Sequence, residues 1–421
     1  MDKYVLNNGM RCIFLPNKNV KSFIFLINIK VGSNNETKEQ NGIAHFLEHM
    51  MFKSTRSYTS KQLLEKLDNI GAYYNATTTN EYTLYYIKSS YKHITDSIKL
   101  MNEIYFYPKF TQADINTERT VVLDEHMINQ NDNDSLLYDY MMKHMYGNTS
   151  NGRPILGTPT TINNLSRTDF INFRKKYYRP NNTCIVLSGN FNLKEIKSYI
   201  KKKFDKNPKI QLNDSIRYLE KRQTTPEVLC KYEKQSARTT IIICFRSYGF
   251  NNINSYILEI IASVLTGGMS SRLFLKLRNK KGYVYNITAY QKSFTNYGLF
   301  CIETSCNTEY IYDVIHIILD ELKKLKKSHI SSKELRKSQV SITNSIIFMT
   351  ESSFSKANYY SINELFYTPK LKLEDLATKY DDVTITDVKD ISNRIFRNDN
   401  LNVIIMGGVK ESPKLIKMLN I

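Results

Sequence analysis

His45-Phe46-Leu47-Glu48-His49 is the stretch of sequence that decides the fold of this chain of 421 residues. On a helix, residues four apart lie on one face, so His45 and His49 can both point at one metal ion. Glu48, three residues after His45, lies on the same side and can reach water at that ion. Apolar residues surround the motif, as expected for a helix packed on a core: Ile43, Phe46, Leu47, Met50 and Met51.

A distant carboxylate would complete a metal site. The pattern H-x-x-E-H reverses H-E-x-x-H, and both are zinc peptidase signatures. Two imidazoles and Glu125, 76 residues after His49, give three protein ligands and leave the fourth position of a tetrahedral zinc ion open. A lone histidine is usually structural, but the chain has only 7 histidines, so chance rarely produces this spacing. The sequence therefore predicts one zinc ion held by His45, His49 and Glu125.

The length and composition favour a multidomain globular protein. A chain of 421 residues exceeds one ordinary hydrophobic core, and no apolar run is long enough to span a membrane. The N-terminus enters a strand-like pattern directly, without a signal-peptide or presequence pattern. None of the 6 cysteines shows C-x-x-C spacing. We therefore expect reduced, buried thiols and a cytoplasmic location.

The net charge of +19 has two explanations. Acidic substrates or nucleic acid would attract such a chain. However, the lysines are spread along the whole sequence, which is also rich in Asn, Ile and Tyr, as an AT-biased genome would produce. Because no nucleic-acid motif accompanies the charge, we predict no specific nucleic-acid partner.

Two pairs of similar segments predict an internal duplication. The segment 71–75 (Gly-Ala-Tyr-Tyr-Asn) resembles 282–286 (Gly-Tyr-Val-Tyr-Asn), and each follows a helix-like segment. Near the ends of the two halves, 178–182 (Tyr-Arg-Pro-Asn-Asn) resembles 396–400 (Phe-Arg-Asn-Asp-Asn), and each leads into a strand and a glycine. Because the two pairs of similar segments occur in the same order in both halves, they indicate repeated domains of about 200 residues.

The order of expected elements gives the fold class. In each half a strand precedes two helices, two further strands and two long helices, which is typical of an α+β domain with a mostly antiparallel sheet covered by helices. We expect a metal-binding domain at 1–212, a polar linker at 213–226 and a homologous domain at 227–421. The second half has no histidine between Phe245 and Ile315, so it cannot repeat the metal motif.

Two longer stretches resemble a known family, the pitrilysin-type (M16) zinc metallopeptidases. The first is Gly42–Thr55, and the second is Glu118–Glu125, which matches an E-R-x-V-[IV]-L-x-E run. The resemblance covers essentially the whole chain and is closest to the two-domain branch that includes bacterial processing-type peptidases and the mitochondrial processing peptidase β subunit. It implies two homologous domains that face each other around a chamber.

The resemblance also implies roles for single residues. Glu125 would be the third zinc ligand, and Glu118 would orient a ligand. Arg278 and Tyr285 would assist catalysis from the domain without metal. Asn75 and Ala76 would lie on an edge strand that pairs with substrate. Alternatives remain for three of them: Glu118 could pair with a neighbouring base, Arg278 could be a solvent-facing residue of a charged helix end, and Tyr285 is one of 30 tyrosines.

The function expected from these features is that of a zinc-dependent endopeptidase. It would hydrolyse peptides or extended precursor segments in an enclosed chamber, with Glu48 activating water. The alternative is a catalytically silent peptide-binding or scaffold subunit of the same fold, although such relatives typically lack parts of the motif. A second copy or a related partner chain would complete the chamber in a dimer.

Overall fold

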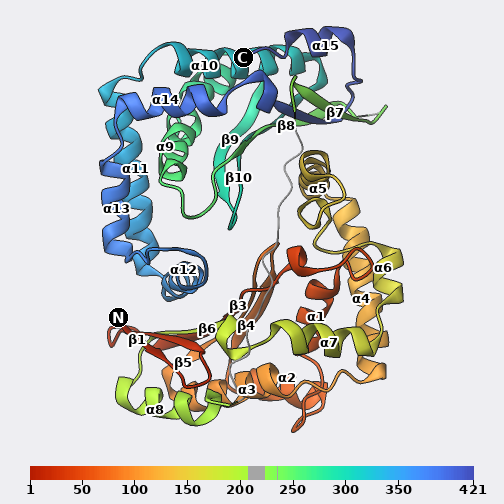
Figure 1. The fold of residues 1–421 in the computed structure, drawn as a ribbon, viewed down its shortest axis with the longest axis vertical. Helices are drawn as coiled ribbons and strands as arrows, with labels where there is room; N and C mark the ends of the chain where they lie inside the picture. The colour runs from red at the N-terminus through yellow and green to blue at the C-terminus, as the bar shows by residue number, and fades with distance from the viewer. Residues whose placement is uncertain (207–222, 235) are drawn as a thin grey trace. The chain divides into compact units, whose positions relative to one another are not determined.

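A computed structural model describes residues 1–206, 223–234 and 236–421 (Figure 1). The described residues form two compact units, each built on one β-sheet. The first unit comprises the described parts of residues 1–128, 148–217 and 349–370. The second comprises those of residues 129–147, 218–348 and 371–421.

The first unit contains a six-stranded sheet of order β1-β2-β6-β3-β5-β4. Its strands are β1 (Asp2–Val5), β2 (Arg11–Pro16), β3 (Ser22–Ile29), β4 (Tyr73–Thr78), β5 (Thr83–Ser90) and β6 (Thr183–Gly189). Its helices are α1 (Ile43–Met51), α2 (Ser60–Asn69), α3 (Ile94–Phe106), α4 (Gln112–Gln130), α6 (Pro159–Asn164), α7 (Arg167–Tyr177), α8 (Leu193–Phe204) and α12 (Ser353–Phe366). Strands β2 and β6 are parallel, and the other neighbours are antiparallel.

The second unit contains a five-stranded sheet of order β7-β11-β8-β10-β9. Its strands are β7 (Glu227–Tyr232), β8 (Arg238–Ser247), β9 (Val284–Ser293), β10 (Gly298–Asn307) and β11 (Asn402–Gly407). Its helices are α5 (Asn133–Tyr146), α9 (Asn254–Thr266), a π-helix η5 (Phe274–Lys280), α10 (Ile311–Lys327), α11 (Ser332–Glu351), α13 (Leu373–Asp381), α14 (Ile385–Ile395) and α15 (Pro413–Met418). Here β7 and β11 are parallel, and the other neighbours are antiparallel.

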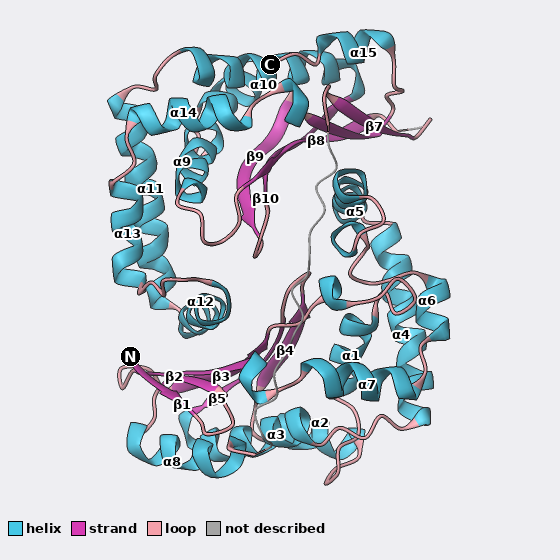
Figure 2. Cartoon of the chain, viewed as in Figure 1, coloured by secondary structure: helices cyan, strands magenta, loops and turns pink. Residues whose placement is uncertain are grey.

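The two sheets share one strand order. Apart from β1, the order β2-β6-β3-β5-β4 of the first sheet corresponds, strand for strand in sequence, to β7-β11-β8-β10-β9 of the second. The single parallel pair also falls at the same place in both sheets. Figure 2 shows both sheets with their surrounding helices. The predicted fold class is therefore confirmed: two homologous α+β domains with mostly antiparallel sheets covered by helices.

The central strands of the first sheet are buried on both faces. Alternate residues of a strand point to opposite faces. In β3, Phe25 and Ile27 join the main core, whereas the buried Asn28 donates its side-chain amide to Ser361 Oγ in α12 at 3.0 Å. Helix α12 therefore covers the second face of this sheet. It comes from the second half of the sequence, between residues that belong to the other unit.

Helix α5 covers one face of the second sheet in the same way. Its Leu137 and Met141 are fully buried against residues of β8, β10 and β11, such as Cys244 and Ile404. This helix comes from the first half of the sequence. Each sheet is thus covered by a helix from the opposite half, so the compact units and the sequence halves do not coincide. The division into 1–212, 213–226 and 227–421 stays a prediction, and residues 213–222 of the expected linker lie outside the described part of the chain.

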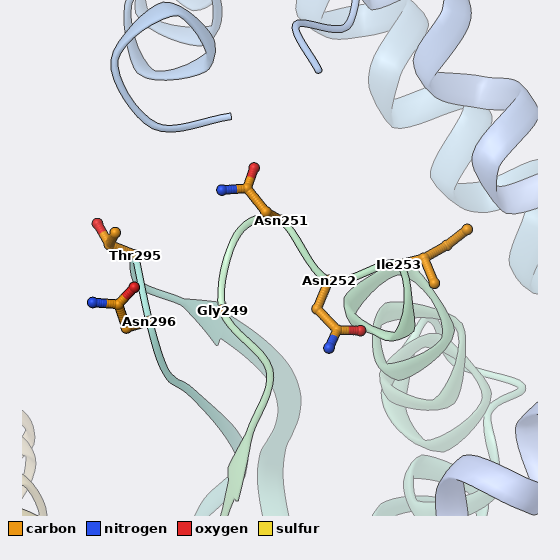
Figure 3. A pocket seen from close by; sticks show the side chains of 6 residues that line it. All are labelled: Gly249, Asn251, Asn252, Ile253, Thr295 and Asn296. Carbon is orange, nitrogen blue, oxygen red and sulfur yellow. The ribbon is translucent and has the colours of Figure 1, made fainter. Parts of the chain in front are cut away.

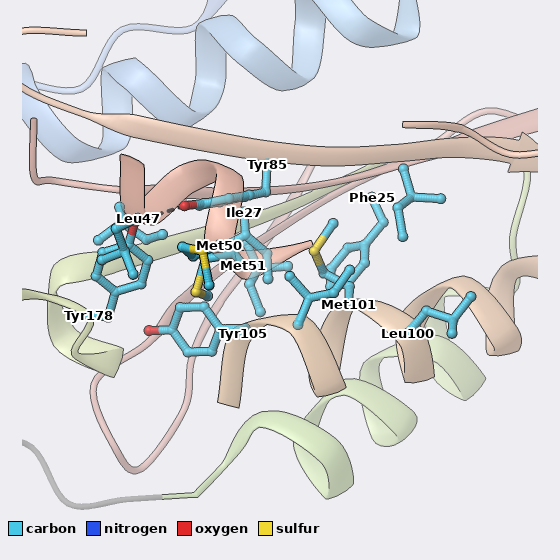
Figure 4. Close-up of a cluster of buried hydrophobic side chains, with 14 of the residues drawn as sticks. Phe25, Ile27, Leu47, Met50, Met51, Tyr85, Leu100, Met101, Tyr105 and Tyr178 are labelled. Atoms are coloured by element: carbon cyan, nitrogen blue, oxygen red, sulfur yellow. Dashed lines mark hydrogen bonds between the residues drawn. The ribbon is translucent and has the colours of Figure 1, made fainter. Parts of the chain in front are cut away.

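The core of the first unit fixes helix α1, which carries the H-x-x-E-H motif. Leu47, Met50 and Met51 are 0–1% exposed and join the buried cluster drawn in Figure 4. On another side of the helix, the ring of Phe46 lies edge-on to that of Phe170 in α7, with centroids 4.8 Å apart. This packing holds a short helix whose polar side chains are the motif residues His45, Glu48 and His49.

One element differs in type from the sequence-based expectation. The segment that includes Leu277 resembles the helix before Gly71 and was expected to be an α-helix. It forms the π-helix η5. A π-turn inserts one residue into the hydrogen-bond pattern, which three- and four-residue periodicity does not reveal.

Candidate metal centre

The motif histidines converge on one point. His45 and His49 lie one turn apart on α1, with their Nε2 atoms 3.3 Å apart and their ring centroids 4.6 Å apart. His45 is buried and His49 is half-buried. Helical spacing alone would allow other side-chain rotamers of the two histidines. Their convergence therefore depends on the tertiary structure around the helix.

Helix α4 brings a carboxylate to the same point. Glu125 Oε2 lies 3.3 Å from His49 Nε2 and 3.6 Å from His45 Nε2. Ile115, Glu118, Val122 and Glu125 follow one another at spacings of three and four, so they share a face of α4, and Ile115 and Val122 are fully buried. The anchored apolar residues therefore aim the two carboxylates at α1.

The three side chains form a donor set that fits a divalent cation. Among the described residues, His45, His49 and Glu125 are the one group of three or more His, Cys, Asp or Glu side chains whose ligand atoms all lie within 4.8 Å of one another. Two imidazole nitrogens and one carboxylate oxygen match the ligands of catalytic zinc sites. The residues predicted as ligands are thus brought together.

Hydrogen bonds within the cluster shift the pKa values of His49 and Glu125. Burial lowers the pKa of His49, but hydrogen bonds to Glu118 and Glu125 outweigh it and raise the pKa to about 9. Hydrogen bonds from His45 and His49 hold the pKa of Glu125 well below its usual range. Since metal ligands must be deprotonated, a cation would displace protons here.

Glu118 contacts the side of His49 that faces away from the cluster. His49 Nδ1 lies 2.9 Å from Glu118 Oε1, and Lys53 Nζ forms an ion pair with Glu118 Oε2. Burial raises the pKa of Glu118, but these two partners lower it overall. The bond favours the tautomer with the proton on Nδ1, which leaves the Nε2 lone pair free for a metal. Lys53 was not singled out from the sequence, because a lysine after a helix end carries no signal of its own.

Glu48 lies beside the cluster and has a partner that the sequence did not reveal. Thr78 Oγ1, at the end of β4, donates to Glu48 Oε2 at 2.6 Å. Burial raises the pKa of Glu48, and the charges of His45 and His49 act in the opposite direction. A buried carboxylate with one oxygen already bonded has the other oxygen available for a ligand or water.

Strand β4 is an edge strand whose last residue, Thr78, contacts Glu48 of helix α1. It pairs with β5 and lies last in the sheet order, so one of its sides has no strand partner among the described residues. Asn75 is exposed and accepts the backbone N–H of Ala76 at 2.8 Å. Both residues therefore lie where an extended peptide could add a strand. That use stays a prediction.

Arg278 and Tyr285 form a local pair in the second unit. The Arg278 guanidinium lies 4.7 Å from the ring of Phe274 and 5.0 Å from the ring of Tyr285, and Tyr285 is 77% exposed. The π-helix and the start of β9 hold this stack. The two residues lie in a different compact unit from the histidines, and their participation in the metal centre stays a prediction.

A hollow in the second unit lacks comparable chemistry. Figure 3 shows it between the loop before α9 and the β9–β10 turn, with a volume of about 400 Å³. It is lined by Gly249, Asn251, Asn252, Ile253, Thr295 and Asn296. These residues include no acid, base or nucleophilic thiol, so the metal cluster remains the candidate site.

Comparison with known proteins gives matches along the chain. Residues 13–159 match the family model described as Insulinase (Peptidase family M16), and residues 164–340 match the Peptidase M16 inactive domain. The uncharacterized zinc protease YmxG of Bacillus subtilis is 30% identical, with 94% of this chain and 96% of that protein covered. The uncharacterized zinc protease SCO5738 of Streptomyces coelicolor is 26% identical, with 95% and 88% covered.

Solved structures share the fold. A protease from Helicobacter pylori superposes with a TM-score of 0.88 at 23% identity, covering 96% of this chain and 98% of that one. A peptidase M16 inactive domain from Pseudomonas fluorescens gives a TM-score of 0.86 at 17% identity, covering 98% and 99%.

Proposed function

Because the chain belongs to peptidase family M16, we propose that it is a zinc-dependent endopeptidase whose metal is held by His45, His49 and Glu125. The observation that carries the proposal is the convergence of these three ligand atoms, with separations of 3.3–3.6 Å, beside the buried Glu48. Relatives named zinc proteases support the choice of metal.

The donor set suits zinc in particular. Two nitrogens and one oxygen with an imidazole oriented by a carboxylate are typical of catalytic zinc sites, whereas magnesium and calcium prefer all-oxygen sites. When bound, zinc polarises a carbonyl group and lowers the pKa of water to about 7.

Glu48 would act as the base and then the acid. It takes a proton from the attacking water as the new C–O bond forms, and gives that proton to the amide nitrogen as the C–N bond breaks. Thr78 holds one oxygen of Glu48 and leaves the other to transfer the proton. Glu118 keeps the imidazole of His49 in the tautomer that the site requires.

The substrate would be an extended peptide. Its backbone would add to the edge strand β4 near Asn75 and Ala76, so main-chain hydrogen bonds would supply affinity with weak sequence dependence. Arg278 and Tyr285 would stabilise the developing oxyanion in an enclosed chamber. The roles of Arg278 and Tyr285 and the enclosed chamber rest on the family resemblance.

A catalytically silent peptide-binding subunit is the second candidate. Its support is the match of residues 164–340 to a domain described as inactive. That match falls mostly on the half that lacks the histidine motif, whereas His45, Glu48, His49 and Glu125 all lie within the stretch that matches the insulinase model. The enzyme is therefore the better supported candidate.

The proposal extends to assembly and location. No described helix combines the length and apolar character that crossing a bilayer requires. All 6 cysteines are free thiols, and five of them are buried, which suits a reducing compartment such as the cytoplasm. We expect a homodimer or a pair with a related chain, which the mass of the purified protein in solution would test.

The decisive experiment combines metal content with turnover. The purified protein should contain about one zinc per chain and cleave quenched-fluorescent peptides, and a chelator should stop cleavage. Glu48→Gln should abolish turnover and keep zinc bound, because Glu48 is not a ligand. Glu39→Gln, at an exposed carboxylate, is the matched control and should behave like the wild type. Wild-type rates in Glu48→Gln would refute the mechanism, and a zinc-loaded wild type without turnover would favour the silent subunit.

A further inference from the structure

Helix α1 has an unusual N-terminus. The first backbone N–H groups of a helix have no partner within the helix and need acceptors from elsewhere. In α1 the N-cap residue is Gly42, which has no side chain, and the first turn contains no acidic residue. With 9 residues, the helix is too short to be stable by itself, so its first turn depends on outside contacts.

Glu36 supplies the missing acceptors. Its Oε1 accepts the backbone N–H of Ala44 at 2.8 Å, and its Oε2 accepts the backbone N–H of Gly42 at 2.9 Å. Oε2 also accepts the side-chain amide of Asn41 at 2.9 Å. Thus both oxygens are used, and all three partners are donors.

The carboxylate is held in place from several sides. Glu36 is 5% exposed, and its backbone carbonyl accepts Arg153 Nη2 at 2.7 Å. The Asn41 amide also donates to the carbonyl of Pro154 at 2.9 Å. Loop residues far away in sequence therefore place Glu36 against the end of α1.

The donors around both oxygens match an ionised carboxylate. Burial outweighs the three hydrogen bonds and Arg153 and raises the pKa of Glu36 to about 8, so the cap is fully charged only above this pH. A protonated carboxyl group would need an acceptor for its own O–H, and each of its three partners is a donor. A negative charge at this position also complements the positive end of the helix dipole.

We infer that Glu36 is a positioning residue for the metal site, because its carboxylate caps the helix that carries both histidine ligands. The inference rests on the proposed zinc site. His45 lies in the first turn of α1, directly after Ala44, so a frayed first turn would move His45 away from His49 and Glu125. The predicted cost is a loss of metal affinity in addition to a loss of stability.

Three variants separate the cap from a general charge effect. Glu36→Gln keeps the shape but turns an NH₂ group towards N–H donors. Glu36→Asp keeps the charge but is one methylene shorter, so it loses reach. Glu39→Gln removes an exposed carboxylate from the same loop and is the matched control.

The first readout needs neither metal nor activity. Hydrogen–deuterium exchange of peptides covering residues 42–47 is measured in the metal-free full-length protein. We expect these amides to exchange about two- to thirtyfold faster in Glu36→Gln and to change little in Glu39→Gln. Glu36→Asp should lie between them, and it tests the inference even if Glu36→Gln does not fold. Unchanged exchange in folded Glu36 variants would show that Glu36 does not cap helix α1.

The second readout is zinc affinity, measured by competition with a chromophoric chelator. We expect Glu36→Gln to bind zinc about ten- to a hundredfold more weakly than the wild type, as for other residues that support metal ligands. Wild-type affinity in a variant with accelerated exchange would leave Glu36 as a cap without a positioning role and overturn the inference. If the wild type itself bound no zinc, the proposed function would fail instead. The exchange result would still show whether Glu36 caps helix α1.

Discussion

Thr78 Oγ1 lies 2.6 Å from Glu48 Oε2 and donates a hydrogen bond to it. The threonine ends the edge strand β4, and the glutamate lies in the middle of the motif helix α1. This bond joins the strand expected to bind substrate to the group expected to move the proton. It fixes which carboxylate oxygen is available to water.

Thr78→Val should therefore reduce turnover without removing the metal. Valine keeps the shape of threonine but has no hydroxyl group, so Glu48 would be free to rotate. We expect kcat to fall about ten- to a hundredfold with little change in KM. Peptide cleavage kinetics and zinc content would be measured together.

Thr78→Ser is the matched control for this prediction. Serine retains the donor and should keep most of the activity. Equal rates for Thr78→Val and the wild type would mean that the bond does not matter to catalysis.

Glu118→Gln should weaken zinc binding. The change removes the charge that orients His49 Nδ1 and leaves the ion-pair partner Lys53 without its carboxylate. We expect zinc affinity to fall about ten- to a hundredfold. Chelator competition would measure it. Lys53→Met keeps the bond between Glu118 and His49, so its zinc affinity should change less; the reverse order would contradict this assignment.

Gly42→Ala should destabilise the first unit far more than Gly71→Ala. Both glycines have positive φ, at 95° and 57°. A Cβ atom at Gly42 would lie 2.6 Å from Ile162 Cδ1 and 2.8 Å from the carbonyl oxygen of Leu156, whereas at Gly71 it would meet nothing within 4 Å. We expect a loss of about 2–5 kcal/mol at Gly42 and about 1–2 kcal/mol at Gly71. Denaturant unfolding would compare the two variants, and equal losses would contradict the steric explanation.

Glu259 should make the second unit less stable as the pH rises. Burial raises its pKa from 4.5 to about 7, although the hydroxyl group of Tyr380 donates to it. Between these two values the folded state holds a proton that the unfolded state has lost, so the stabilisation is complete below pH 4.5 and is lost as the pH rises through 7.

The matched variant Glu259→Gln isolates this effect. The stability difference between wild type and variant should shift by about 3 kcal/mol against the wild type from pH 4.5 to pH 8. Urea unfolding of both proteins across this range would measure it. Parallel curves would show that Glu259 does not titrate between the two states.

Much of the site could be predicted from the sequence because its spacing is local. His45, Glu48 and His49 lie within one helical segment, where the spacing places them on one face of the helix. Glu118 and Glu125 are likewise seven residues apart on one helix. The resemblance linked these two segments, and the structure brings His45, His49 and Glu125 together as expected.

The supporting residues could not be predicted in this way. Thr78, Lys53 and Glu36 are ordinary polar residues at a strand end, after a helix and in a loop. Their importance arises from partners that lie far away in sequence, such as Glu118 for Lys53, or from contacts to the backbone of a nearby helix start, and neither leaves a periodic pattern. The π-helix η5 was missed for a related reason, because one inserted residue is invisible to helical spacing.

The sequence by itself predicted the α+β class, the duplication and the candidate ligands His45 and His49 from spacings and alternations within short segments, and the family resemblance added Glu125. Only the tertiary structure decided that α5 and α12 each cover the sheet of the opposite half, and which polar groups hold α1 and Glu48. The physical reason is the sequence separation of the interacting residues. Local geometry is set by residues that are neighbours in sequence, whereas burial and hydrogen-bond partners depend on which distant parts of the chain meet.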